Sequence, residues 1–82
     1  MILTQEQIRD AFNMWVRELQ DMRIEARKCE SAIDKLVEAR GKESYGTERY
    51  TKIDSKIKEV FKYWDYVIER IDECHRRLAN FV

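Results

Sequence analysis

Two runs of apolar residues, spaced by alternating steps of three and four, constrain this chain more than any other feature. The spacing averages about 3.5 residues, which keeps the side chains on one helix face and lets them interlock with a facing helix. We call these runs the first seam and the second seam. The first seam contains Ile8, Phe12, Trp15, Leu19, Met22, Ala26, Cys29, Ile33 and Leu36, and the second contains Tyr50, Ile53, Ile57, Val60, Trp64, Val67, Ile71, Cys74, Leu78 and Phe81. The pattern predicts an all-α fold, an antiparallel two-helix coiled-coil hairpin.

The local signals at the ends of the two seams predict where the helices begin and end. Thr4 followed by Gln7 has the form of a capping box, and Thr47 is a suitable N-cap for a second helix. The chain has no proline and only two glycines, and either Gly41 or Gly46 could supply a left-handed C-cap. Alternatively, Gly41 lies inside a longer first helix and only Tyr45 to Thr47 form the bend. With 82 residues available, we expect one helical-hairpin domain over 1–82: a helix over about 5–40, a turn over about 41–47 and a helix over about 48–81.

Two registers of the hairpin, one heptad apart, keep every apolar layer matched. The first brings the chain ends flush and sets Ile8 against Leu78 and Phe12 against Cys74, and then Trp15 against Ile71, Met22 against Trp64 and Ile33 against Ile53. The second pairs Glu18 with Arg77 and Glu25 with Arg70, but leaves about ten N-terminal residues overhanging. Exposed ion pairs contribute only ~0.5 kcal/mol each, whereas burying one more Ile or Phe is worth ~2 kcal/mol. We therefore expect the flush register.

The second helix carries more apolar surface than a two-stranded coiled coil needs. A row at seven-residue spacing lies beside its seam and comprises Phe61, Ile68, His75 and Val82. The first helix adds Val16 and Val37 on the equivalent flank, where Arg23 and Glu30 interrupt the row. Further helices can pack on such a flank, so the hairpin is predicted to dimerise into a four-helix bundle or to dock on another protein. Alternatively, these residues only thicken the hairpin's own interface.

Tyrosines next to this row extend the predicted interface. Tyr66 should point largely outward and Tyr63 partly so, and a ring with a wet hydroxyl suits an interface hot spot. The predicted partner interface therefore comprises Phe61, Tyr63, Tyr66, Ile68, His75 and Val82.

No residue pattern indicates an enzyme, a cofactor or a metal site. His75 is the only histidine, its nearest acid on the same face is Asp72, and the seams carry no inward carboxylates that could complete a helical metal site. Cys29 and Cys74 occupy seam positions far apart along an antiparallel hairpin, so we expect reduced thiols rather than a disulfide. We assign no catalytic, cofactor-binding or metal-binding residue, and Arg40 is expected to cap the last carbonyls of its helix.

The charge pattern argues against several classes of partner. Sixteen basic and sixteen acidic residues balance over the chain. Both signs interleave along the second helix, so no strong field attracts nucleic acid.

The start of the chain lacks a secretory signal and no stretch reaches the length of a membrane span, which favours the cytoplasm. We expect neither a membrane nor a small-molecule substrate as partner.

The opening residues, from Leu3 through Glu6 and Phe12 to Trp15, resemble the start of some small phage-encoded helical proteins. That resemblance implies a regulator or inhibitor that binds a host protein. The residues themselves predict a non-enzymatic interaction module that self-associates as a homodimer, docks another protein, or does both. Direct nucleic-acid binding is the least favoured alternative.

Overall fold

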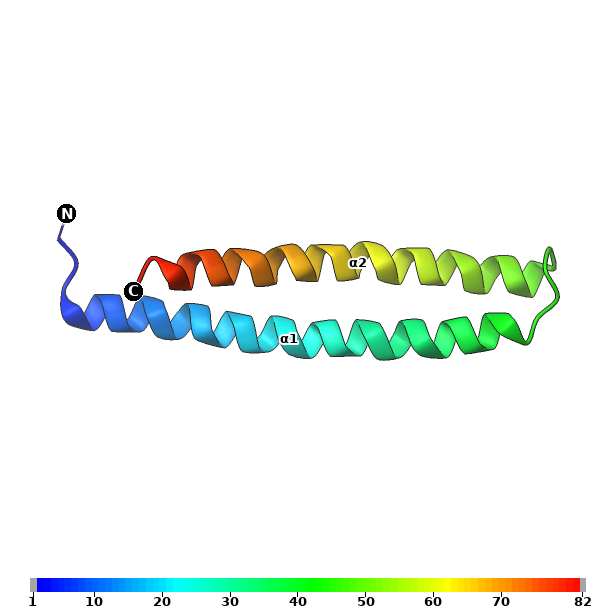
Figure 1. The fold of residues 1–82 in the computed structure, drawn as a ribbon, viewed down its shortest axis with the longest axis horizontal. Coiled ribbons are helices and arrows are strands. Elements are labelled where there is room, and N and C mark those ends of the chain that lie inside the picture. Colours follow the sequence, from blue (N-terminus) through cyan, green and yellow to red (C-terminus); the bar gives the residue numbers. More distant parts are fainter. Residues whose placement is uncertain (1, 82) are drawn as a thin grey trace.

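The chain folds into two long antiparallel helices joined by a short loop (Figure 1). The computed structural model describes residues 2–81, and these form a rod measuring 62 × 18 × 15 Å. Helix α1 spans Gln5–Gly41 and helix α2 spans Glu48–Ala79. No strand occurs in the described part of the chain. The predicted all-helical hairpin is confirmed.

Side-chain caps set the start of both helices. The Thr4 side chain accepts a hydrogen bond from the Gln7 backbone N–H at 3.1 Å, and the Gln7 side chain accepts one from the Thr4 N–H at 2.9 Å. The predicted capping box is therefore confirmed. At the second helix, the Thr47 hydroxyl oxygen accepts from the Tyr50 N–H at 3.2 Å, as expected for an N-cap.

The end of α1 differs from the expected left-handed cap. Its C-cap is Lys42, which keeps right-handed helical angles. Gly41 is the last residue of the helix and has no positive φ, whereas Gly46 has a φ of 85° and lies within the loop, just before Thr47. Gly46 thus provides the left-handed residue that redirects the chain into α2, and the prediction that a glycine caps α1 is wrong.

The hairpin buries very little apolar surface for a chain of its length. Among the described residues only six are buried: Leu19, Ala26, Cys29, Ile57, Val67 and Cys74. Val67 and Cys74 are fully enclosed, whereas the larger seam residues Trp15, Met22, Trp64 and Ile71 are only half-buried. The two seams face each other, but one line of contact does not cover them.

The helix ends are not flush, so the preferred register is wrong at the end of the hairpin away from the loop. The first turns of α1 project past the end of α2 (Figure 1). Phe12 packs edge-on against Phe81, with ring centroids 5.7 Å apart, instead of facing Cys74. Ile8 remains 42% exposed. The physical reason is length: α1 has 37 residues and α2 has 32, so helices joined at one end cannot finish level at the other.

The ion pairs predicted for the shifted register are not formed either. Glu18 pairs with Arg70 at 2.9 Å rather than with Arg77. Glu25 accepts a hydrogen bond from Tyr63 at 3.2 Å rather than pairing with Arg70. The Arg77 guanidinium instead lies 5.6 Å from the centre of the Trp15 ring. The cross-helix contacts therefore reproduce neither predicted register in full.

Cys29 and Cys74 are free thiols, as expected, and both are buried in the seam. Burial raises the pKa of each thiol, and Glu25 raises that of Cys29 further, as Glu18 does for Cys74. A higher pKa leaves less of the reactive thiolate.

The two glycines should respond oppositely to alanine. At Gly46 the left-handed backbone should make Gly46→Ala cost about 1 kcal/mol of unfolding free energy. At Gly41, which is helical and has nothing within 4 Å of an added Cβ, Gly41→Ala should stabilise by about 0.5 kcal/mol. Urea unfolding at equal protein concentrations measures both, and equal effects would contradict the assigned backbone conformations.

The buried thiols should react slowly while the chain is folded. With an aromatic disulfide reagent at pH 8, we expect Cys29 and Cys74 to react at least about tenfold more slowly than in urea. A Ser44→Cys variant, whose new thiol stands on the exposed loop, provides the control and should react at the rate of a free thiol. Fast reaction of the native thiols in the folded chain would contradict their burial.

Candidate protein interface

One long edge of the hairpin is closed by polar contacts between the helices. Arg70 donates to Glu18 at 2.9 Å, and the Tyr63 hydroxyl donates to Glu25 at 3.2 Å. The hydrogen bond from Arg70 to Glu18 raises the pKa of the guanidinium. Desolvation raises the pKa of the Tyr63 hydroxyl, and the nearby Glu25 carboxylate adds to the shift. We call this side the closed edge.

The opposite side, which we call the open edge, is formed by one row of each helix at seven-residue spacing. The rows consist of Val16, Arg23, Glu30 and Val37 on α1 and Asp54, Phe61, Ile68 and His75 on α2. Residues seven apart share a helix face, and these positions lie on the side of each seam away from the closed edge. Phe61 is 45% exposed and Val37 is 42% exposed, while Val16 and Ile68 are half-buried. The open edge therefore exposes apolar side chains, interrupted by charged ones, alongside the incompletely covered seams.

Two charged residues stand in the middle of the α1 row. Arg23 and Glu30 are both exposed. Within residues 2–81 neither forms an ion pair, since the salt bridges of the hairpin involve other side chains. They leave one positive and one negative side chain without a partner in the middle of an apolar edge.

The loop end of the open edge is closed by Arg40 and Asp54. Their side chains form an ion pair at 2.7 Å, and Lys58 approaches the other Asp54 oxygen at 3.3 Å. The hydrogen bond from Arg40, with that from Lys58, lowers the pKa of the Asp54 carboxyl. The prediction that Arg40 caps carbonyls is wrong, because the guanidinium reaches across to α2 and lies 5.9 Å from the centre of the Tyr50 ring.

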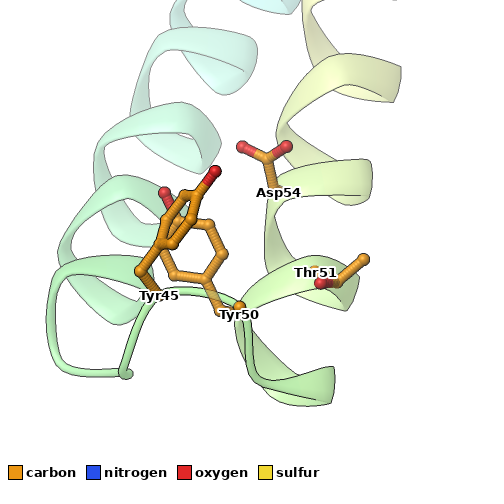
Figure 2. Close-up of a pocket in the computed structure, with 5 residues that line it drawn as sticks. Tyr45, Tyr50, Thr51 and Asp54 are labelled. Carbon is orange, nitrogen blue, oxygen red and sulfur yellow. The ribbon is translucent and has the colours of Figure 1, made fainter.

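A surface depression lies beside this ion pair, lined by Tyr45, Gly46, Tyr50, Thr51 and Asp54. Figure 2 shows the Tyr45 and Tyr50 rings together at the loop, the Asp54 carboxyl between the helices and Thr51 directed away from them. The two rings meet edge-on, 5.2 Å apart. Because Arg40 and Lys58 already pair with Asp54, the depression offers no unpaired acid for a ligand.

The structure does not bring all of the predicted interface residues together. Phe61, Ile68 and His75 share the open edge. Tyr63 lies on the closed edge, and its ring is 6.1 Å from that of the exposed Tyr66. Val82 lies outside the described residues.

Sequence reasoning did not identify the role of Asp54. It stands seven residues before Phe61 in the same row. The available signal was the charged Arg40 at a seam position, where pairing with a carboxylate of the facing helix offsets the partial desolvation of the guanidinium.

The described residues hold neither a metal-binding cluster nor a membrane-spanning helix. Residues 2–81 contain no group of three His, Cys, Asp or Glu side chains that could hold a metal ion. Neither α1 nor α2 includes a segment that is apolar over the length needed to cross a membrane.

Comparison with known proteins yields no relative. The chain matches no protein-family model, no curated protein and no solved structure.

Proposed function

We propose that this chain is a non-enzymatic interaction module that self-associates through its open edge to form a four-helix bundle. The observation that carries the proposal is incomplete burial along one side of the hairpin. The half-buried seam and the exposed Phe61 and Val37 lie next to each other there. A second hairpin would cover both, which is how helix pairs complete a bundle core.

The small core supports the same conclusion. A chain of 82 residues is near the size at which one core is marginal. Among residues 2–81 the fully buried side chains are only Val67 and Cys74. Trp64 adds an unfavourable contribution, because its indole N–H is buried without a hydrogen-bond partner in residues 2–81. Burying the open edge in a dimer adds apolar contacts that the isolated hairpin lacks.

The proposal assigns the module to the cytoplasm, where seam cysteines such as Cys29 and Cys74 stay reduced. Docking on a different protein is the alternative use of the same edge. It predicts a stable monomer that keeps Phe61 exposed.

Phe61→Asp should disrupt the dimer. A two-fold interface contains the substitution twice, so placing two carboxylates in an apolar contact should weaken association by at least about 100-fold. Light scattering coupled to size exclusion, from about 1 to about 100 μM, measures the mass, and circular dichroism at the same concentrations measures helicity.

Tyr66→Asp is the matched control. Tyr66 is on the same helix and is 53% exposed, against 45% for Phe61, but it lies on the other side of α2. This variant should retain the dimer mass. A wild-type chain that stays monomeric and helical throughout the concentration range would refute self-association, and equal weakening by both substitutions would refute the assignment to the open edge.

A further inference from the structure

The order of residues along the open edge specifies how a second copy would lie. On α1 the row reads Val16, Arg23, Glu30, Val37. If two α1 helices cross antiparallel about a two-fold axis between Arg23 and Glu30, Val16 meets Val37 of the second copy. Arg23 then meets Glu30 of the second copy. The row is complementary to its own reverse, which is the requirement of a two-fold interface.

The row on α2 has the same property. It reads Asp54, Phe61, Ile68, His75. Reversed about a point between Phe61 and Ile68, it sets Phe61 against Ile68 of the second copy and Asp54 against His75. The apolar pair is at the centre. The pair of Asp54 with His75 of the second copy contributes less to the preference between dimer orientations, because Arg40 and Lys58 already contact Asp54.

The two centres lie within one helical turn of each other along the hairpin, so a single axis serves both rows. Glu25 lies between Arg23 and Glu30, and Tyr63 lies between Phe61 and Ile68. Their side chains hydrogen bond across the hairpin at 3.2 Å. One two-fold axis perpendicular to the helices therefore passes through the middle of both rows.

We propose, on the basis of the self-association proposed above, that two copies pack open edge to open edge with their loops at opposite ends. In this arrangement α1 faces α1 and α2 faces α2, both antiparallel. The occupant of the open edge is a second copy of this chain, and charge complementarity selects it: the Arg23 and Glu30 side chains, which form no ion pair in the described hairpin, pair across the axis twice.

The other face-to-face dimer, with both loops at one end, sets unlike rows against each other. There α1 faces α2 of the second copy, so Arg23 opposes Ile68 and Glu30 opposes Phe61. Charged side chains would then lose water without gaining a partner, which disfavours the arrangement.

The distance between the two loops tests the orientation. A spin label on Ser44→Cys can be attached under native conditions, because Cys29 and Cys74 are buried. With a rise of ~1.5 Å per residue from the axis to the loop, we expect the two labels about 50 Å apart when the loops are at opposite ends. Loops at one end would give a distance below about 30 Å. Double electron–electron resonance measures the distance.

Charge reversal provides a second test that leaves the apolar contacts intact. Arg23→Glu alone and Glu30→Arg alone each place like charges across the axis, so each should weaken the dimer about tenfold at low salt. Mixing the two single variants should restore wild-type affinity through a heterodimer, and so should combining both changes in one chain.

The outcomes separate this inference from the proposed function. A label distance below about 30 Å, or a dimer whose affinity is not restored by mixing, overturns the orientation while self-association stands. A wild-type chain that is monomeric by light scattering overturns both proposals.

Discussion

Two helices packed side by side bury only the stripe along which they touch, and this constraint underlies the whole structure. The hairpin encloses Val67 and Cys74 fully but leaves large seam residues such as Trp64 half-covered. Because burial of apolar surface is the main stabilising term, a single line of contact gives little stability to a rod 62 Å long. The two edges differ in which side chains lie over the uncovered part of the seams.

The two edges cover the seams with different kinds of side chain. On the closed edge, Glu18, Glu25, Arg70 and Tyr63 link the helices and cover the seam with polar groups. On the open edge, the Arg40 and Asp54 ion pair links the helices near the loop. The rest of this edge carries apolar side chains, interrupted by Arg23 and Glu30. This division assigns the proposed function to one edge and leaves the Tyr63 and Tyr66 rings on the other side of the molecule.

Features set by local interactions could be predicted from the sequence. The capping box at Thr4 and Gln7 depends on residues three apart, and the seam helices depend on apolar periodicity, so both were evident. The row of Phe61, Ile68 and His75 was also visible as a seven-residue repeat. The overhang of the first turn at Ile8 belongs to the register that sequence reasoning did not prefer, because the extent of the overhang depends on the difference between the two helix lengths. The ion pair between Arg40 and Asp54 was missed because it depends on how the loop sets the helices against each other.

If a second copy supplies the burial that one hairpin lacks, the stability of the chain depends on its concentration. Folding coupled to dimerisation makes the urea midpoint rise with protein concentration. We expect a clear rise in the midpoint followed by circular dichroism between about 1 and about 100 μM under reducing conditions. A midpoint that does not change over this range would show that the single hairpin is stable alone, and would contradict folding coupled to dimerisation.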